Sequence, residues 1–476
     1  MKTSWMNRSR AVARLLPLAA TLAAGGAAAE EASGDWNGLL LGQLHIVVHV
    51  KKDAAGHYGA TMESPDQGKF VLSAEQVVVD AEHLGFKIAQ IGGSYAGTWN
   101  AARNGWVGTW TQGQSIALVL TRMTGATSTL PVAKRPQEDA IAAGPRPYRQ
   151  EAVHFDNAAA GVRLAGTLSV PEGRGPFPAV VLIAGSGPET RDEEVLGHKV
   201  FLVLADALNR RGIAVLRYDK RGIGESTGDY ATANISAFAA DAECALAFLK
   251  SRPEIAADRL GLVGHSEGGA VAPMIAVRNP SARFVVLMAG PGMPIGALLR
   301  LQNAKILKAS GVPDETIARK IAFFEKLDAD LAAARSDEQA LAVAKADTAQ
   351  AVADQLVPAA NAEAFARQIT SPWAREALGF DPIPSLRKVK VPVLALNGSL
   401  DLQVPPDEDL GPIRAALRGD PDATIVELPR LNHLFQTART GMPTEYGDIE
   451  ETMAPVALKT IVDWVAAQGA VARKAP

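Results

Sequence analysis

Short apolar runs alternate with helical segments through the second half of the chain, and this alternation limits the possible folds more than any other feature. Runs of the buried-strand type lie at 177–183, 213–218, 260–263, 284–288 and 391–396. An alternating strand at 162–170 precedes them, and the clearest helix, 237–250, carries the lone cysteine, Cys244, on its apolar face. Strands that alternate with helices predict a mostly parallel sheet covered on both sides.

A different texture precedes this region and predicts a small antiparallel β domain over 30–123. Apolar residues alternate with others from Leu44 to Val50, and Gly-Thr-Trp occurs at 97–99 and again at 108–110. We expect a meander whose tryptophans enter one core, with an aromatic sugar- or lipid-binding face as the alternative. Residues 124–149 contain four prolines and few large apolar residues, which predicts a linker to the domain at 150–476.

About a hundred residues of helical periodicity, approximately 291–388, interrupt the strands before the run at 391–396. An insertion at the carboxyl edge of a parallel sheet can lie over the crevice where ligands bind. We therefore expect a helical cap over a site, and the alternative is a structural side domain without contact to the substrate.

The first 29 residues have the pattern of a secretory signal peptide. Four basic residues precede a short apolar stretch, 15–24, and three alanines stand at 27–29. The apolar stretch is too short to cross a bilayer of roughly 30 Å. We expect export to the periplasm or the medium, cleavage just before Glu30, and no stable membrane anchor afterwards.

Charge and cysteine content exclude several kinds of function. The net charge of −3 and the pI near 6.3 give no sign of a basic nucleic-acid-binding face. With one cysteine, neither an intrachain disulfide nor a thiolate zinc site is possible. His45, His49 and His57 lack a metal-ligand spacing, so we expect neither a metal nor an organic cofactor.

A possible nucleophile lies between an apolar run and a helical segment. Gly264-His265-Ser266-Glu267-Gly268 matches G-x-S-x-G. The match alone is weak, but strand, sharp turn and helix are what a nucleophile elbow needs, because the strained turn exposes the Ser266 hydroxyl. The alternative is an ordinary glycine-rich turn.

A serine hydroxyl needs a base, and the base needs an acid that fixes its tautomer. Of the eight histidines, His433 alone follows Ser266 in the chain, and it stands just past an apparent strand. Asp401 comes directly after the run at 391–396, where a carboxylate points into the crevice. We predict the triad Ser266, Asp401 and His433, with Asp407 and Asp409 as competitors for the acid.

The tetrahedral intermediate of acyl transfer needs donors for its oxyanion. One is expected to be the backbone N–H of Glu267, at the start of a helix. The loop after the run at 177–183 supplies the second, for which we choose the Ser186 amide, with Gly187 as the alternative. The glycine-containing turn at 217–226 is interpreted as structural.

From about 153 to 466 the chain resembles the α/β-hydrolase superfamily. The resemblance rests on Gly185-Ser186-Gly187, on Asp219-Lys220-Arg221-Gly222-Ile223-Gly224, on the segment around Ser266, and on Asp401 and His433. The signal peptide, β-rich front domain and helical insertion resemble exported bacterial carboxylesterases grouped with serine aminopeptidase-like hydrolases. The resemblance implies an eight-stranded sheet, a helical cap and an acyl-enzyme. Many relatives have His-Gly where this chain has Ala184-Gly185.

These observations predict an exported serine carboxylesterase that acts on a small-molecule ester. Its rivals are a small-peptide peptidase or aminopeptidase with the same triad, and an acyltransferase if the cap excludes water. A non-catalytic binding protein would have no need of serine, aspartate and histidine in this order.

Overall fold

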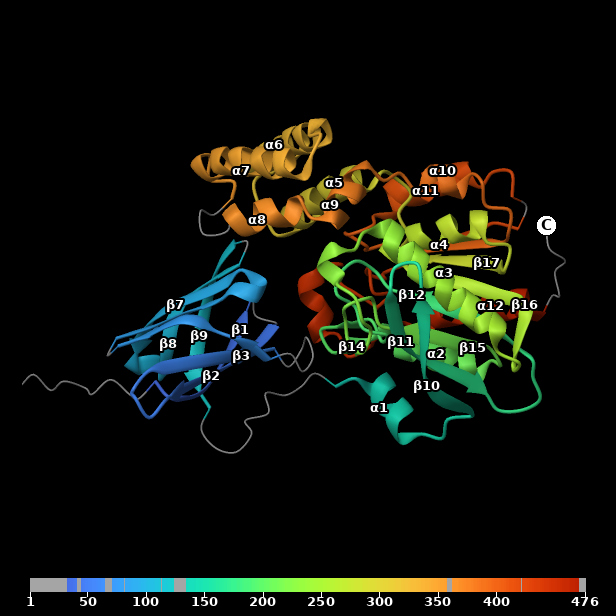
Figure 1. The fold of residues 1–476 in the computed structure, drawn as a ribbon, viewed down its shortest axis with the longest axis horizontal. Helices are drawn as coiled ribbons and strands as arrows, with labels where there is room; N and C mark the ends of the chain where they lie inside the picture. The colour runs from blue at the N-terminus through green and yellow to red at the C-terminus, as the bar shows by residue number, and fades with distance from the viewer. Residues whose placement is uncertain are drawn as a thin grey trace, which may run out of the picture.

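The computed structural model describes residues 32–40, 44–64, 71–80, 82–112, 114–123, 134–357, 362–420 and 422–470. The predicted signal peptide, 1–29, lies outside the described residues. Two large sheets organise the rest of the chain, one of nine strands and one of eight. Figure 1 shows the two sheets as separate units, with a group of helices above the first.

The first sheet is antiparallel throughout, as the alternation of apolar residues predicted. Its strands, in the spatial order β4-β3-β2-β1-β9-β8-β7-β6-β5, are hydrogen-bonded to their neighbours. Their bounds are β1 Gly34–Leu40, β2 Leu44–Lys52, β3 Tyr58–Glu63, β4 Val71–Ser73, β5 Glu75–Val79, β6 His83–Ile88, β7 Gly93–Asn100, β8 Gly105–Gln112 and β9 Gln114–Arg122.

Tryptophans fill the core of this sheet. Trp36, Trp106 and Trp110 are each at most 1% exposed, and Trp99 packs edge-on against the first two. In the β7–β8 register Gly97 lies opposite Gly108, so the two Gly-Thr-Trp segments begin at one cross-strand pair, and Trp99 lies opposite Trp106. The prediction that tryptophans enter one core is confirmed, and three of the four are unavailable to a binding face.

The second sheet is the mostly parallel one. Its order is β10-β11-β15-β12-β16-β17-β18-β19, in which β11 is antiparallel to both of its neighbours, β10 and β15, and the strands from β15 to β19 are parallel to one another. The bounds are β10 Tyr148–Asn157, β11 Val162–Pro171, β12 Phe177–Ile183, β15 Ala214–Tyr218, β16 Ile255–His265, β17 Ala282–Met288, β18 Val393–Gly398 and β19 Thr424–Leu428. A separate short hairpin joins β13 Glu194–Val195 to β14 His198–Lys199.

Helices cover both faces of the second sheet, as the alternating pattern predicted. Helix α3 (Ile235–Ser251) packs beside α4 (Glu267–Arg278), and α2 (Val200–Arg210) packs beside α12 (Pro455–Ala470). Helix α11 (Pro406–Ala416) contacts β18. The central strands are buried on both sides, which explains why they are continuous apolar runs.

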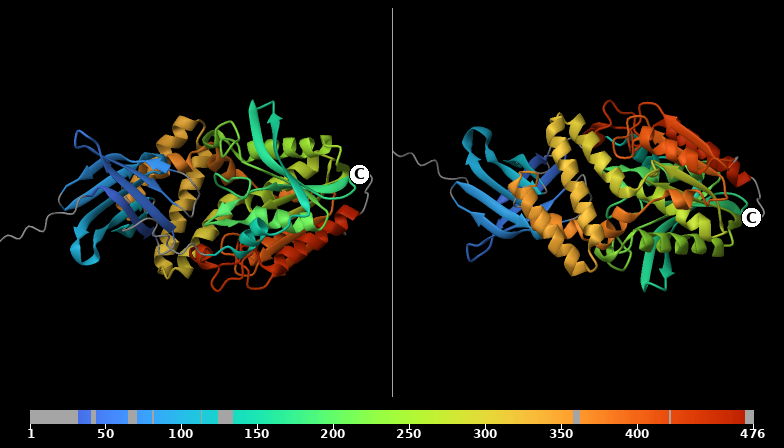
Figure 2. Two further views of the ribbon diagram at one scale, coloured as in Figure 1. Left: turned by 90° about the horizontal axis from the view of Figure 1, so that it is seen from below. Right: turned by 90° about the horizontal axis from the view of Figure 1, so that it is seen from above.

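The predicted insertion is helical over its described residues. It comprises α5 Ile295–Ala309, α6 Asp314–Ala333, α7 Asp337–Ala353, α8 Ala362–Ile369, α9 Pro372–Gly379 and α10 Ile383–Leu386. Apolar residues of α6, α7 and α8 form a separate small core. Figure 1 shows α6, α7 and α8 above the N-terminal sheet, with α5 and α9 between these helices and α10, and Figure 2 shows the same yellow and orange helices from below and from above. Within the described residues, no helix is both long and apolar enough to cross a membrane.

One boundary differs from the prediction. Residues 136–143, inside the predicted linker 124–149, form helix α1, and its Ile141 belongs to the core of the second sheet's domain. The Gln137 side chain donates to the Met453 carbonyl at 2.9 Å and accepts from the Thr452 N–H at 2.7 Å. The prolines concealed this helix, because Pro136 occupies its first turn, where proline is tolerated. The domain that contains the second sheet therefore begins near Lys134 rather than at residue 150.

Candidate active site

Ser266 occupies the sharp turn between β16 and α4. Its backbone has φ 51° and ψ −117°, a strained conformation for a residue with a side chain. Close packing requires the flanking glycines: a Cβ at Gly264 would lie 2.0 Å from the Gly268 carbonyl oxygen, and one at Gly268 would lie 2.0 Å from that of Ile183. The structure therefore has the strand, strained turn and helix that the sequence indicated.

His433 and Asp401 come together at the carboxyl end of the sheet. The His433 Nδ1 lies 2.8 Å from Asp401 Oδ2, and both side chains are buried. The other carboxylate oxygen of Asp401 accepts hydrogen bonds from the backbone N–H groups of Gln403 and Val404, both at 2.8 Å. Buried Asn432 fixes the histidine loop by accepting from two backbone N–H groups through its Oδ1. Hydrogen bonds to the backbone therefore hold both Asp401 and the loop that carries His433 in place.

The competing acids lie elsewhere. Asp407 is exposed on α11, while the buried Asp409 accepts the Gly292 N–H at 2.7 Å. Burial raises the pKa of Asp409 to about 7, and the nearby charge of Asp401 adds to this rise. Asp401 is therefore the one of the three carboxylates that is bonded to His433.

Ser266, His433 and the two predicted oxyanion residues, Glu267 and Ser186, line one cavity of about 380 Å³. Side chains from α5 and α9 also line it, among them Leu298 and Trp373. The prediction that the helical insertion covers the crevice is therefore confirmed. The remaining wall is mostly apolar and includes Ile235 and Leu434.

Sequence reasoning missed a buried ion pair beneath Ser266. His265 Nδ1 lies 2.9 Å from Glu193 Oε1, and His265 Nε2 lies 3.0 Å from the His433 carbonyl oxygen. Burial opposes charge on His265, but the Glu193 carboxylate and the hydrogen bonds raise its pKa to about 9. His265 thus donates from both ring nitrogens at neutral pH and holds the His433 backbone. Nothing but its place beside Ser266 signals it in the sequence.

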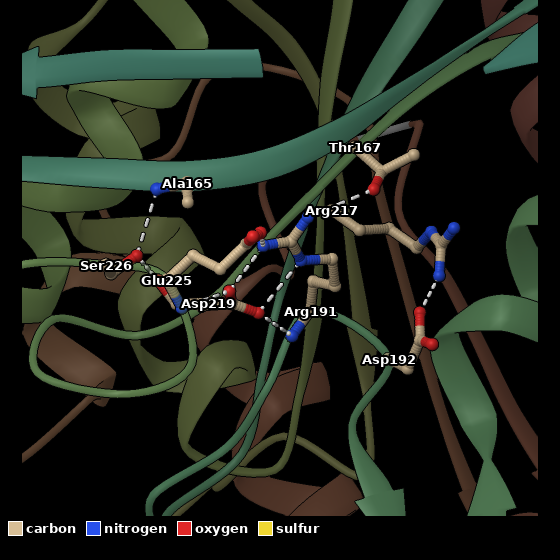
Figure 3. A network of polar contacts seen from close by, with 8 residues as sticks. All are labelled: Ala165, Thr167, Arg191, Asp192, Arg217, Asp219, Glu225 and Ser226. Carbon is tan, nitrogen blue, oxygen red and sulfur yellow. Dashed lines mark hydrogen bonds and ion pairs between the residues drawn. The ribbon is translucent and has the colours of Figure 1, made fainter. Parts of the chain in front are cut away.

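The turn after β15, predicted to be only structural, anchors the loop that carries Ser186. Asp219 accepts hydrogen bonds from the Arg191 backbone N–H at 2.8 Å and from its guanidinium, and Arg217 pairs with Asp192 (Figure 3). Burial favours a protonated Asp219, but Arg191 and the Glu225 N–H keep its pKa below the usual value. A network of charged side chains therefore joins the loop that carries Ser186 to the turn after β15.

Glu189, in the same loop, is one of the residues that line the cavity. Burial and the nearby charge of Glu193 raise its pKa to about 8, against the opposing charges of Lys220 and His265. Glu189 is therefore mostly protonated at neutral pH. In this state its carboxyl can donate a hydrogen bond, but it carries no full charge to hold a cation.

The raised pKa of Glu189 predicts a pH-dependent difference in stability. The folded state holds the proton more tightly than the unfolded state, whose pKa is near 4.5, so this stabilisation is complete below about pH 4.5 and is lost as pH rises toward 8. Glu189→Gln should therefore melt several degrees above the unchanged protein at pH 9 and within a degree of it at pH 4, by calorimetry. The exposed Glu172→Gln is the control. An equal difference at both pH values would contradict the assignment.

Three histidines of the N-terminal domain, His49, His57 and His83, lie close to carboxylates. His49 Nδ1 lies 2.7 Å from Asp35 Oδ1, and His57 Nδ1 lies 3.4 Å from Asp53 Oδ2. Across the described part of the chain, no group of three or more His, Cys, Asp or Glu side chains is arranged to hold a metal ion.

Strand order, a helical cap, a strained serine turn and a buried aspartate–histidine pair define a protein of the α/β-hydrolase class. The family model described as serine aminopeptidase, S33, matches residues 198–435, half of the chain, and this range contains Ser266, Asp401 and His433. The chain belongs to this family.

Similarity to individual proteins covers parts of the chain. It is 30% identical to esterase EstD of Thermotoga maritima over 284 residues, which are 60% of this chain and 61% of that protein. An uncharacterized protein of Mycobacterium tuberculosis is 31% identical over 26% of the chain and 41% of its own length. The chain thus spans less than two thirds of these relatives.

Solved structures with a similar fold are more distant. The α/β hydrolase GrgF of Penicillium aligns with 68% of this chain and 100% of its own at 18% identity, with a TM-score of 0.42. An esterase of Pyrococcus furiosus aligns with 73% of this chain and 97% of its own at 15% identity, with the same TM-score.

Proposed function

We propose that this protein is a serine hydrolase that cleaves carboxylic esters through an acyl-enzyme on Ser266. The observation that carries the proposal is the buried Asp401–His433 pair, whose histidine lines the same cavity as Ser266, a serine in a strained turn. Asp401 engages Nδ1 of His433, which leaves Nε2 as the nitrogen that can take a proton from Ser266. Family membership and the likeness to an esterase support the same reaction.

The reaction follows from these groups. His433 accepts the Ser266 proton as the hydroxyl oxygen attacks the ester carbonyl, and the backbone N–H groups of Glu267 and Ser186 stabilise the oxyanion. Collapse of the intermediate expels the alcohol, whose oxygen receives from His433 the proton that came from Ser266. Water then attacks the acyl-enzyme as His433 accepts one of its protons, and collapse releases the acid while His433 returns that proton to the Ser266 oxygen. No step requires a metal or an organic cofactor.

A peptidase is the second candidate, because two residues with carboxyl groups, Glu189 and Glu267, are among those that line the cavity. An aminopeptidase must hold the substrate ammonium with a fixed carboxylate. The Glu267 side chain is already bonded to Lys220 at 2.9 Å and to the Trp373 indole N–H, and Glu189 is mostly protonated at neutral pH. Neither carboxyl suits an ammonium group, which favours the ester.

Matched substrates distinguish the two reactions. We expect kcat/KM for a nitrophenyl ester to exceed that for the matching aminoacyl nitroanilide by about 10³-fold or more, since an amide also requires protonation of a poor leaving group. Both are assayed on one purified preparation. Comparable values would replace the esterase proposal with the peptidase.

We further propose that the protein is exported and acts in the periplasm or the medium. The proposal rests on the basic, apolar and small-residue segments of 1–29. Mass spectrometry of the protein from an expressing bacterium should give a chain that starts near Glu30. A full-length chain confined to the cytoplasm would contradict export.

A further inference from the structure

Lys220, the second residue of the turn after β15, is buried against Gly185 and Glu267, two residues that line the cavity. Its side chain is 6% exposed, and its Nζ donates to the Gly185 carbonyl oxygen at 2.5 Å and to Glu267 Oε1 at 2.9 Å. The ammonium also lies 4.3 Å from the centroid of the Phe238 ring. One cation thus connects the loop that carries Ser186 with the residue that follows Ser266.

The contact with Gly185 controls the direction of the Ser186 N–H. In a planar trans peptide the C=O and the following N–H point to opposite sides of the same group. When the ammonium holds the Gly185 oxygen, it therefore fixes where the Ser186 N–H points, and it polarises that amide so that the N–H becomes a stronger donor. The preceding peptide is held independently, because the Gly185 N–H donates to Glu193 Oε1 at 2.6 Å.

The contact with Glu267 holds the other donor. The backbone N–H of Glu267 begins α4, and its carboxylate is bonded to Lys220 on one oxygen and to the Trp373 indole N–H on the other. Glu267 is 7% exposed, so its side chain has one packed orientation. Lys220 is therefore bonded to the peptide group that ends in the Ser186 N–H and to the side chain of Glu267, whose amides are proposed to face the oxyanion.

We propose that Lys220 is a positioning residue that sets the two oxyanion donors, the backbone amides of Ser186 and Glu267. This inference rests on the proposed acyl-enzyme reaction. Lys220 touches no reacting atom; it acts through the Gly185 peptide and the Glu267 carboxylate. Its removal should weaken binding of the transition state and leave binding of the substrate nearly unchanged.

The loop has a second attachment that keeps the experiment interpretable. Arg191 bonds to Asp219 through its backbone and its guanidinium, independently of Lys220 (Figure 3). We therefore expect Lys220→Met to keep the loop in place. Since this variant leaves Glu267 without its cation, Lys220→Met/Glu267→Gln provides a neutral version in which the introduced amide oxygen can still accept from Trp373.

Kinetics of these variants test the role. For a nitrophenyl ester we expect kcat to fall by about 10² to 10³-fold, as when one oxyanion donor is lost, and KM to change by less than about threefold. Lys220→Arg should recover part of kcat, because it retains a cationic donor. Lys199→Met, at a half-exposed lysine near Glu194, is the matched control and should retain full activity.

Inhibitor binding separates positioning from general damage. A trifluoromethyl ketone forms a tetrahedral adduct with the serine, while the matching secondary alcohol cannot. In Lys220→Met we expect affinity for the ketone to fall by about the factor lost in kcat/KM, with affinity for the alcohol unchanged. Equal losses for both compounds, or a folded variant with kcat within threefold of the unchanged protein, would overturn the proposal.

Folding of the variants and labelling of Ser266 decide two further outcomes. If Lys220→Met does not fold by circular dichroism, the double variant is measured against the same two compounds, and failure of both to fold would make Lys220 a stability residue and overturn the inference. If a fluorophosphonate does not label Ser266 in the unchanged protein, the proposed reaction itself is wrong. Labelled wild-type protein with a fully active Lys220→Met would overturn only the positioning role.

Discussion

Replacing Ser266 or His433 with alanine is expected to lower kcat for a nitrophenyl ester by about 10³-fold or more. Ser266→Ala removes the nucleophile, and His433→Ala removes the base that accepts its proton. Because the two groups act in one step, the double variant should be little worse than either single variant. Steady-state kinetics on all three proteins measure the effect.

Measurements of folding and substitutions at exposed positions serve as controls for this result. His433 is 5% exposed, so circular dichroism and the melting temperature must show that the alanine variant remains folded. Ser310→Ala and His154→Ala change the same residue types at exposed positions and should retain full activity. Near-normal turnover in Ser266→Ala would place the nucleophile elsewhere. Losses that multiply in the double variant would mean that the two residues act independently.

The sequence could indicate those site residues that lie just past the end of a strand. Ser266, Asp401 and His433 each follow a short apolar run, and parallel strands bring their carboxyl ends to one edge. Once the runs were recognised as strands, the order of the chain was enough to bring the three residues near one another. The 2.8 Å contact between Asp401 and His433 agrees with that expectation.

Contacts made between loops could not be predicted in the same way. Glu193 and His265 are 72 positions apart, and Lys220 and Glu267 are 47 apart. Their pairing depends on how the loop after β12 and the turn after β15 fold over the elbow, and no periodicity encodes it. The charges at 219–221 fit an exposed turn equally well in the sequence, whereas the structure buries them.

Helix α1 illustrates a different limit. Proline-rich composition predicted a linker, but Pro136 lies in the first turn of the helix, where its missing N–H costs nothing. The helix is held by Gln137 and Arg135, which bond to backbone groups more than 300 positions away. Tertiary contacts of this kind outweigh local composition.

Asp401→Asn is expected to lower kcat by about 10³-fold while KM stays nearly unchanged. The asparagine carbonyl oxygen can still accept the backbone N–H groups of Gln403 and Val404, so the loop should keep its shape. The new amide N–H would instead face Nδ1 of His433. It would favour the tautomer that carries its proton on Nε2, which cannot act as a base, and it would remove the negative charge that stabilises the imidazolium.

The neighbouring acids provide matched controls for this substitution. Asp407→Asn changes an exposed carboxylate, and Asp409→Asn changes a buried one whose oxygen accepts the Gly292 N–H, a bond that an amide oxygen can retain. Both variants should remain within about threefold of the unchanged protein in kcat. If Asp401→Asn were fully active and Asp409→Asn were not, the acid role would pass to Asp409, and the 2.8 Å contact with His433 would be structural only. The pKa of Asp409 near 7 opposes that result, because a carboxyl that is half protonated at neutral pH stabilises an imidazolium poorly.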